Sequence, residues 1–147
     1  MPSKGQNAAR SPWSFVLLTA LGDSTQLTGS KAPPGEGWLS LSHEQARTLR
    51  AVCDCMIPED DFPSATQAGV LNYIDRKLSR RFRQHRAAYR EGLAAVDELS
   101  RRRFNRDFAW LSPQQQSATL SEFKRLYRKY FDLFHSHTVE GYYGQPQ

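Results

Sequence analysis

The sequence predicts an all-α fold, a compact bundle of four to five helices that follows an irregular N-terminal segment. After residue 39, apolar residues recur three and four positions apart in several windows, which is the repeat of an amphipathic helix. Two serines stand where a helix cap is expected, one of them directly before a proline. Runs of β-branched residues and Asn-Gly or Asp-Gly hairpin turns are absent from the sequence.

Composition limits the chain to one globular domain and a short additional segment. It has 147 residues, of which 39% are hydrophobic and 24% charged, with 20 basic and 15 acidic residues and a net charge of +5. Two cysteines are too few for a disulfide-dense scaffold or a four-cysteine zinc module. No apolar run approaches the ~18 residues of a membrane-spanning helix.

Residues 1–38 form a segment of different character, rich in glycine, proline and serine. An apolar stretch at residues 13–21 follows Lys4 and Arg10, which is the outline of a signal peptide. Pro12 and the absence of an Ala-x-Ala site also allow a packing segment or a degenerate leader. We therefore expect two parts: an irregular or leader-like segment, 1–38, and a helical domain, 39–147.

The first predicted helix begins at Ser42, whose side chain can cap the free amides while Gln45 closes a capping box. Its inner stripe consists of Leu49, Val52, Cys53 and Met56. Pro58 ends it, and a loop of turn residues follows to Ser64.

Two helices are expected next, at residues 64–84 and 86–103. Their inner stripes are Val70, Leu71, Ile74, Leu78 and Phe82 in the first, and Tyr89, Leu93, Val96 and Leu99 in the second. The following connection carries Phe104, Phe108 and Trp110, which we expect to plug the core.

The last helical region starts at Ser112, with Pro113 at the first helical position. An aromatic stripe continues to about residue 139, with a break expected near residues 123–126, and Gly141 and Gly144 are expected to end the helix. The stripe contains Leu120, Phe123, Tyr127, Tyr130, Phe131 and Phe134.

Side chains able to carry chemistry do not form a recognisable catalytic or metal-binding motif. Cys53 and Cys55 point ~200° apart on a helix, so they cannot easily share a metal or a disulfide. His137 and Glu140 have metal-ligand spacing, but a di-metal site in a bundle needs a second such pair. The acids Glu59, Asp60 and Asp61 lack the spacing of an EF-hand. The sequence therefore predicts no catalytic, cofactor-binding or metal-binding residue.

Positive charge is concentrated in one part of the chain. Residues 76–129 hold 15 basic and 5 acidic residues, a net charge of +10, whereas the rest of the chain carries −5. Such asymmetry indicates either solvated helix faces or an anionic partner. A basic helical module that binds nucleic acid is thus an alternative function, although most of the neighbouring aromatic residues lie on inner stripes.

Four landmarks in fixed order resemble a known family. They are LSHEQ at residues 41–45 with IPEDDFPSA at 57–65, AGVLNYID at 68–75, YREGL at 89–93 with FAWLSPQQQ at 108–116, and HTVEGYYG at 137–144. Together they resemble the small, third (gamma) subunit of gluconate 2-dehydrogenase and of related membrane-bound sugar and polyol dehydrogenases.

The resemblance implies a non-catalytic accessory subunit that binds, matures or helps to export a large FAD-dependent dehydrogenase subunit. It places FAD in that partner and haem in a cytochrome c subunit where one is present, with none in this chain. Peripheral membrane association would then come through the complex. We expect partner contacts in the first loop and in the terminal segment, at Pro58, Asp60, Asp61, Pro63, His137, Thr138, Glu140, Gly141, Tyr142, Tyr143 and Gly144.

The resemblance also implies a location in the periplasm or on the periplasmic face of the inner membrane. Leaders in this family contain paired arginines, whereas only Arg10 precedes the apolar stretch here. A cytoplasmic location therefore stays open. The family's Gly/Asn-rich tail after the terminal landmark is also short in this sequence, which ends at Gln147.

Overall fold

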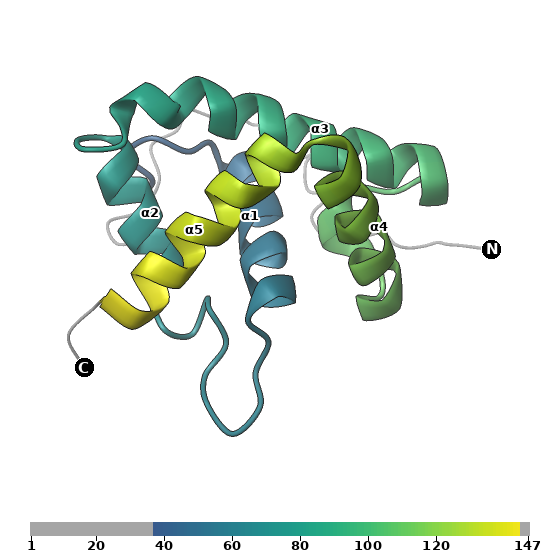
Figure 1. The fold of residues 1–147 in the computed structure, drawn as a ribbon, viewed down its shortest axis with the longest axis horizontal. Helices are drawn as coiled ribbons and strands as arrows, with labels where there is room; N and C mark the ends of the chain where they lie inside the picture. Colours follow the sequence, from purple (N-terminus) through teal and green to yellow (C-terminus); the bar gives the residue numbers. More distant parts are fainter. Residues whose placement is uncertain (1–36, 145–147) are drawn as a thin grey trace, which may run out of the picture. The chain divides into compact units, whose positions relative to one another are not determined.

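The computed structural model describes residues 37–144, and within them the predicted all-α fold is confirmed. It contains five α-helices and two short 3-10 turns, and no strand occurs in this part of the chain (Figure 1). The helices are α1 (His43–Met56), α2 (Val70–Leu78), α3 (Arg86–Phe104), α4 (Pro113–Leu126) and α5 (Arg128–Gly144); the turns are η2 (Arg83–His85) and η3 (Phe108–Trp110). The expected leader-like segment lies almost wholly outside the described residues.

Two helices start as the sequence predicts. The Ser42 hydroxyl accepts the Gln45 amide at 3.0 Å, and the Gln45 side chain accepts the Ser42 amide at 2.9 Å. Ser112 and Gln115 form the same reciprocal pair at the start of α4. These capping boxes satisfy amides that would otherwise lack partners within the helix, and so fix where α1 and α4 begin.

The second helix is shorter than the predicted 64–84. Gly69 has a φ of 87°, a left-handed conformation that favours glycine, so the turns at residues 65–69 cannot continue into the helix. After Leu78 the chain turns again, with the Phe82 amide donating to the Lys77 carbonyl at 2.7 Å. The Arg86 side chain donates to the Leu78 carbonyl at 2.9 Å across this turn. The predicted inner stripe is nevertheless buried, including Phe82.

The predicted break in the last helical region falls at Tyr127, which separates α4 from α5. The prediction that Gly141 ends the helix is wrong, because α5 continues to Gly144. Gly141 is buried against α2: a methyl group there would lie 2.7 Å from the Tyr73 ring. The glycine allows two helices to approach closely rather than terminating one.

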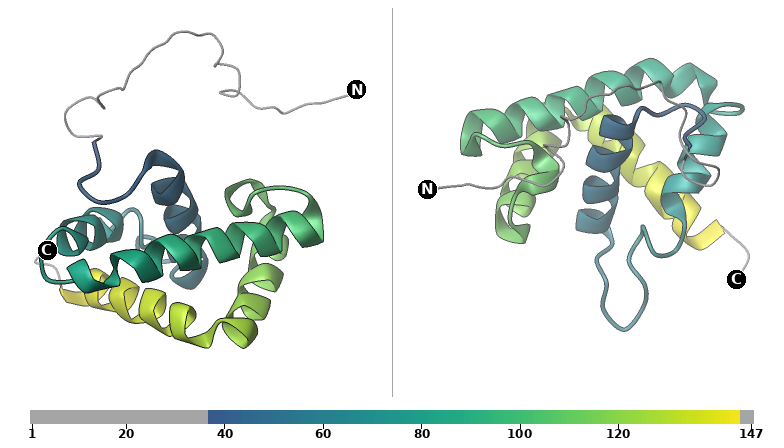
Figure 2. Two further views of the ribbon diagram at one scale, coloured as in Figure 1. Left: turned by 90° about the horizontal axis from the view of Figure 1, so that it is seen from above. Right: turned by 180° about the vertical axis from the view of Figure 1, so that it is seen from behind.

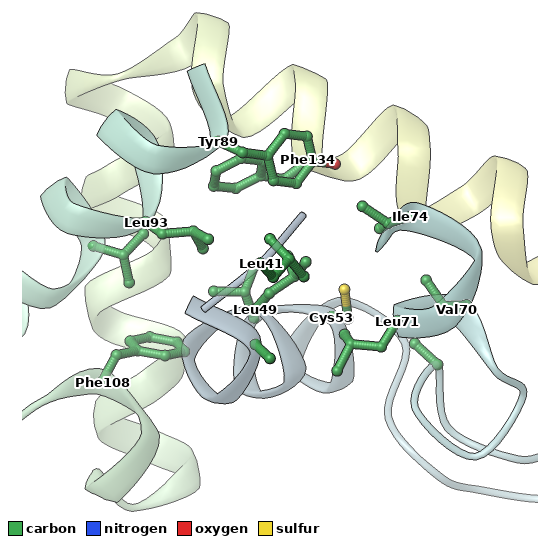
Figure 3. Close-up of a cluster of buried hydrophobic side chains, with 14 of the residues drawn as sticks. Leu41, Leu49, Cys53, Val70, Leu71, Ile74, Tyr89, Leu93, Phe108 and Phe134 are labelled. Carbon is green, nitrogen blue, oxygen red and sulfur yellow. The ribbon is translucent and has the colours of Figure 1, made fainter. Parts of the chain in front are cut away.

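The core lies between all five helices, and Figure 3 shows the part of it where α1, α2, α3 and α5 meet. Fully buried side chains from all of these helices meet there, among them Leu49, Cys53, Ile74, Tyr89 and Phe134. The expected plug after α3 is only partly correct. Phe108 is fully buried, but Trp110 is 44% exposed because it lies on the outer side of η3, beside the guanidinium of Arg47.

Gly92 lies where α5 packs tightly against α3. A methyl group there would lie 2.6 Å from Cζ of Phe134 and 3.2 Å from Cβ of Tyr130. The Phe134 ring is fully buried, and side chains in a close-packed interior do not move aside easily. This packing explains a glycine in the middle of a 19-residue helix.

We expect Gly92→Ala to destabilise the fold by up to about 2 kcal/mol, because overpacking costs about 1–3 kcal/mol and alanine gains only ~1 kcal/mol in helix propensity. Urea unfolding followed by circular dichroism would measure this change. A more stable variant would contradict the packing described for α3 and α5.

Candidate partner-binding surface

The two segments expected to contact a partner lie together at one end of the fold. The hydroxyl of Tyr142, near the end of α5, donates to the carbonyl of Pro63 in the first loop at 2.6 Å. The two residues are 79 positions apart in the sequence. Figure 1 shows the loop projecting beyond α1, and Figure 2 shows it with the end of α5 nearby from behind. We call residues 58–63 and 142–144 the aromatic end.

Hydrogen bonds to backbone and carboxylate acceptors give the projecting loop a defined shape. Its base is closed by the Ala65 amide, which donates to the Ile57 carbonyl at 3.0 Å. Its tip is closed by two bonds between Asp60 and Phe62, one of them from the Phe62 amide to the Asp60 carboxylate at 2.9 Å. Asp54 of α1 accepts the Thr66 amide at 2.8 Å and anchors the returning chain. Such a loop loses little conformational entropy on binding.

Two large aromatic side chains at the aromatic end face solvent. Phe62 is 71% exposed and Tyr143 is 74% exposed, and the Tyr143 ring meets Tyr142 edge-on at 4.9 Å. Aromatic side chains contribute disproportionately to protein interfaces. Our residue-by-residue expectation omitted Phe62, although an aromatic residue between Asp61 and Pro63 in a turn-rich loop was a visible signal.

Several other expected contact residues also lie at this surface. Pro58, Asp60, Asp61 and Pro63 are exposed on the loop, and Gly144 is exposed at the end of α5. Tyr142 is half-buried because its ring packs against the core while its hydroxyl reaches the loop.

Three of the expected contact residues face the interior. His137, Thr138 and Gly141 are buried on the inner side of α5. The Thr138 hydroxyl lies 3.3 Å from the Cys53 sulfur, and His137 Nδ1 lies 2.9 Å from the Tyr89 hydroxyl. In this structure these residues pack α5 onto α1, α2 and α3 and present no surface to another chain.

Glu140 is already engaged within the chain. Its carboxylate accepts a hydrogen bond from the Tyr73 hydroxyl and faces the Arg81 guanidinium at 3.8 Å. Desolvation, followed by that hydrogen bond, raises the pKa of Tyr73 to about 12, so Tyr73 stays a proton donor. Glu140 thus ties α5 to α2 beside the aromatic end.

An open groove of about 800 Å³ lies against the base of the loop. The C-terminal half of α1, the loop and the start of α4 form its walls, with Arg50, Pro58 and Trp110 among the lining residues. The groove lies next to the loop, so a partner bound at the loop could also contact the groove.

The helical part of the chain matches a protein-family model. The family model for gluconate 2-dehydrogenase subunit 3 matches residues 43–147, which include all five α-helices. The chain belongs to the gluconate 2-dehydrogenase subunit 3 family. The resemblance drawn from the four landmarks is thereby confirmed. No curated protein and no solved structure matches the chain.

Membership of the subunit 3 family makes the chain an accessory subunit of a dehydrogenase complex. Its described residues contain no group of three or more His, Cys, Asp or Glu side chains that could hold a metal ion. Burial raises the pKa of Cys53 to about 12, which keeps this thiol protonated and structural. Within residues 37–144 we also find no helix with the length and apolar character needed to cross a membrane.

His137 is a buried basic side chain of the subunit 3 fold, and its surroundings shift its pKa strongly. Its ring stacks on Phe82 with centroids 3.9 Å apart and approaches His85 at 5.4 Å. Burial, followed by the charge of His85, lowers the pKa of His137 to about 4, although Glu140 acts in the opposite direction. The folded subunit therefore holds this imidazole neutral near neutral pH.

We expect this burial to make the subunit sensitive to mild acid. The unfolded chain binds a proton at His137 near pH 6.5 and the folded chain only near pH 4, so stability is lost as pH falls between these values. The loss should approach about 2–3 kcal/mol. Unfolding free energies of the wild type and His137→Gln, measured at several pH values, would test it. Parallel profiles for the two proteins would contradict the assignment.

Proposed function

We propose that this chain is a non-catalytic accessory subunit that binds a FAD-dependent gluconate, sugar or polyol dehydrogenase subunit through its aromatic end. One observation carries the proposal. The Tyr142–Pro63 hydrogen bond joins two sequence-distant segments into one surface that displays Phe62 and Tyr143. Family membership supplies the dehydrogenase context.

The shape of the aromatic end supports a protein as its partner. The loop projects from the fold, so it has the form of an insert for a concave surface on another chain (Figure 1). The exposed rings of Phe62 on the loop and Tyr143 on α5 would bury apolar area, while Asp60 and Asp61 could meet basic residues at the rim. Hydrogen bonds already fix the loop, so its geometry is prepared for docking.

In this proposal the subunit supports the maturation or export of its partner rather than the oxidation itself. FAD belongs to the large subunit, and haem to a cytochrome c subunit in complexes that contain one. The complex works in the periplasm or on the periplasmic face of the inner membrane, and it can hold the chain at that membrane.

Affinity purification of the tagged full-length chain from its native host tests the proposal. We expect a large protein to co-purify and to show the absorbance spectrum of bound FAD. The isolated chain should not oxidise gluconate in the presence of an electron-accepting dye, whereas the co-purified complex should oxidise its own sugar or polyol. Recovery of the free chain alone, or sugar oxidation by that chain, would contradict the proposal.

A further inference from the structure

A second surface with different chemistry lies at the junction of α2, η2 and α3, where Arg81 reaches Glu140 of α5. Residues 76–90 carry seven basic side chains and no acidic one, and we call this segment the basic corner. Its basic residues are Arg76, Lys77, Arg80, Arg81, Arg83, Arg86 and Arg90. Figure 1 shows the corner where the chain turns from α2 into α3.

Packing directs these side chains outward. Leu78, Phe82 and Tyr89 of the same segment are buried and occupy the inner side of the corner. The arginines between them are exposed. Arg86 and Arg90 are four residues apart on α3, so they share one helix face. The Nε of Arg86 donates to the Leu78 carbonyl, and this bond holds the Arg86 side chain in place across the turn.

Most of the charge at the basic corner is not neutralised within the described part of the chain. Arg81 pairs with Glu140, and Lys77 lies over the Tyr73 ring at 5.4 Å. Arg76, Arg80, Arg83 and Arg90 form no ion pair with any residue of the described range 37–144. Three arginines elsewhere differ: Arg102, Arg125 and Arg128 each pair with an acid on their own helix, at 2.9 to 3.4 Å.

We propose that the basic corner binds the phosphate groups of an anionic phospholipid surface. Guanidinium groups bind phosphate oxygens through paired hydrogen bonds, and a headgroup layer supplies phosphates without requiring one fixed arrangement. Each basic side chain near such a surface strengthens binding about fivefold. Several unpaired arginines at one corner therefore give measurable attachment, independent of the proposed dehydrogenase partner.

The composition of the basic corner favours lipid over a macromolecular partner. Single-stranded nucleic acid is usually held by stacking on exposed aromatic rings, but Phe82 and Tyr89 of the corner are buried. Stable protein interfaces centre on apolar side chains removed from water, and no exposed large hydrophobic residue lies within 76–90. A headgroup layer needs only the charge that the corner presents.

Co-sedimentation of the full-length chain with vesicles tests the proposal. Vesicles of phosphatidylcholine mixed with phosphatidylglycerol should bind the protein at low salt, and pure phosphatidylcholine should not. The variant Arg80→Gln/Arg83→Gln/Arg90→Gln should bind about a hundredfold more weakly, at fivefold for each arginine. All three side chains are exposed, so circular dichroism should show an unchanged fold.

The matched control is Arg102→Gln/Arg125→Gln/Arg128→Gln, which removes the same charge from paired arginines. It should retain most of the vesicle binding. An equal loss in both variants would show that net charge alone drives binding and would overturn the proposal. Absence of binding at low salt, or tighter binding to a DNA duplex that the first variant abolishes, would also overturn it.

Discussion

Replacing Asp75 with alanine should lower the free energy of unfolding by about 4 kcal/mol. The carboxylate is buried on α2 and accepts the backbone amides of Leu39, Ser40 and Leu41 at 2.7, 2.8 and 3.1 Å. Alanine removes the acceptor, so these three partly buried amides lose their hydrogen-bond partner. The segment that precedes α1 would then lose its anchor on α2.

Urea unfolding followed by circular dichroism measures this effect. Asp132→Ala serves as the control, because Asp132 is an exposed acid on α5 that pairs only with Arg128 at 3.4 Å. An exposed ion pair contributes little, so the control should leave stability nearly unchanged. Equal losses for the two variants would contradict the role given to Asp75.

The double variant Phe62→Ser/Tyr143→Ser should weaken binding to the dehydrogenase partner about a thousandfold. Aromatic anchors at the centre of an interface cost about 2 kcal/mol or more each when removed. Both side chains are more than two-thirds exposed, so the variant should retain the fold and its thermal stability. Titration of the purified partner with each protein gives the two dissociation constants.

The matched control for that prediction is Leu126→Ser/Tyr127→Ser at the junction of α4 and α5. These residues are 48% and 36% exposed, so the control removes a similar kind of apolar surface away from the aromatic end. It should bind the partner like the wild type. Equal affinities for both double variants would contradict the assignment of the interface.

Local signals explain the parts of the fold that the sequence predicts well. Ser42 and Ser112 cap α1 and α4 through contacts that span only three residues, so the pattern of residues suffices. The inner stripes of α1, α2 and α3 follow the helical repeat and are largely buried. The break between α4 and α5 likewise falls next to the expected position.

Features that depend on long-range packing could not be predicted in this way. Glycine often ends a helix, so the sequence alone suggests that role for Gly141. Its contact with Tyr73 can be predicted only if the way in which α5 crosses α2 is known. Asp75 anchors residues more than 30 positions away, which no local pattern indicates. The same reason explains why His137 and Thr138 were expected at a partner surface, although α5 turns them inward.

The aromatic end illustrates both cases. The loop and the terminal segment each contained visible signals, namely turn residues and paired tyrosines. Their union through Tyr142 and Pro63 is a tertiary contact, and it makes one surface out of two candidate regions. Phe62 becomes a candidate contact residue only in that arrangement. A single exposed aromatic side chain is common, whereas two on one surface indicate a binding site.

Photo-crosslinking from a single position tests the central claim most directly. A photoreactive phenylalanine analogue at position 62 of the full-length chain, illuminated in the native host, should form one dominant adduct with a flavin-containing protein. The same analogue at position 127, on the exposed α4–α5 junction, should not form that adduct. A flavoprotein adduct from position 127 and none from position 62 would contradict the account.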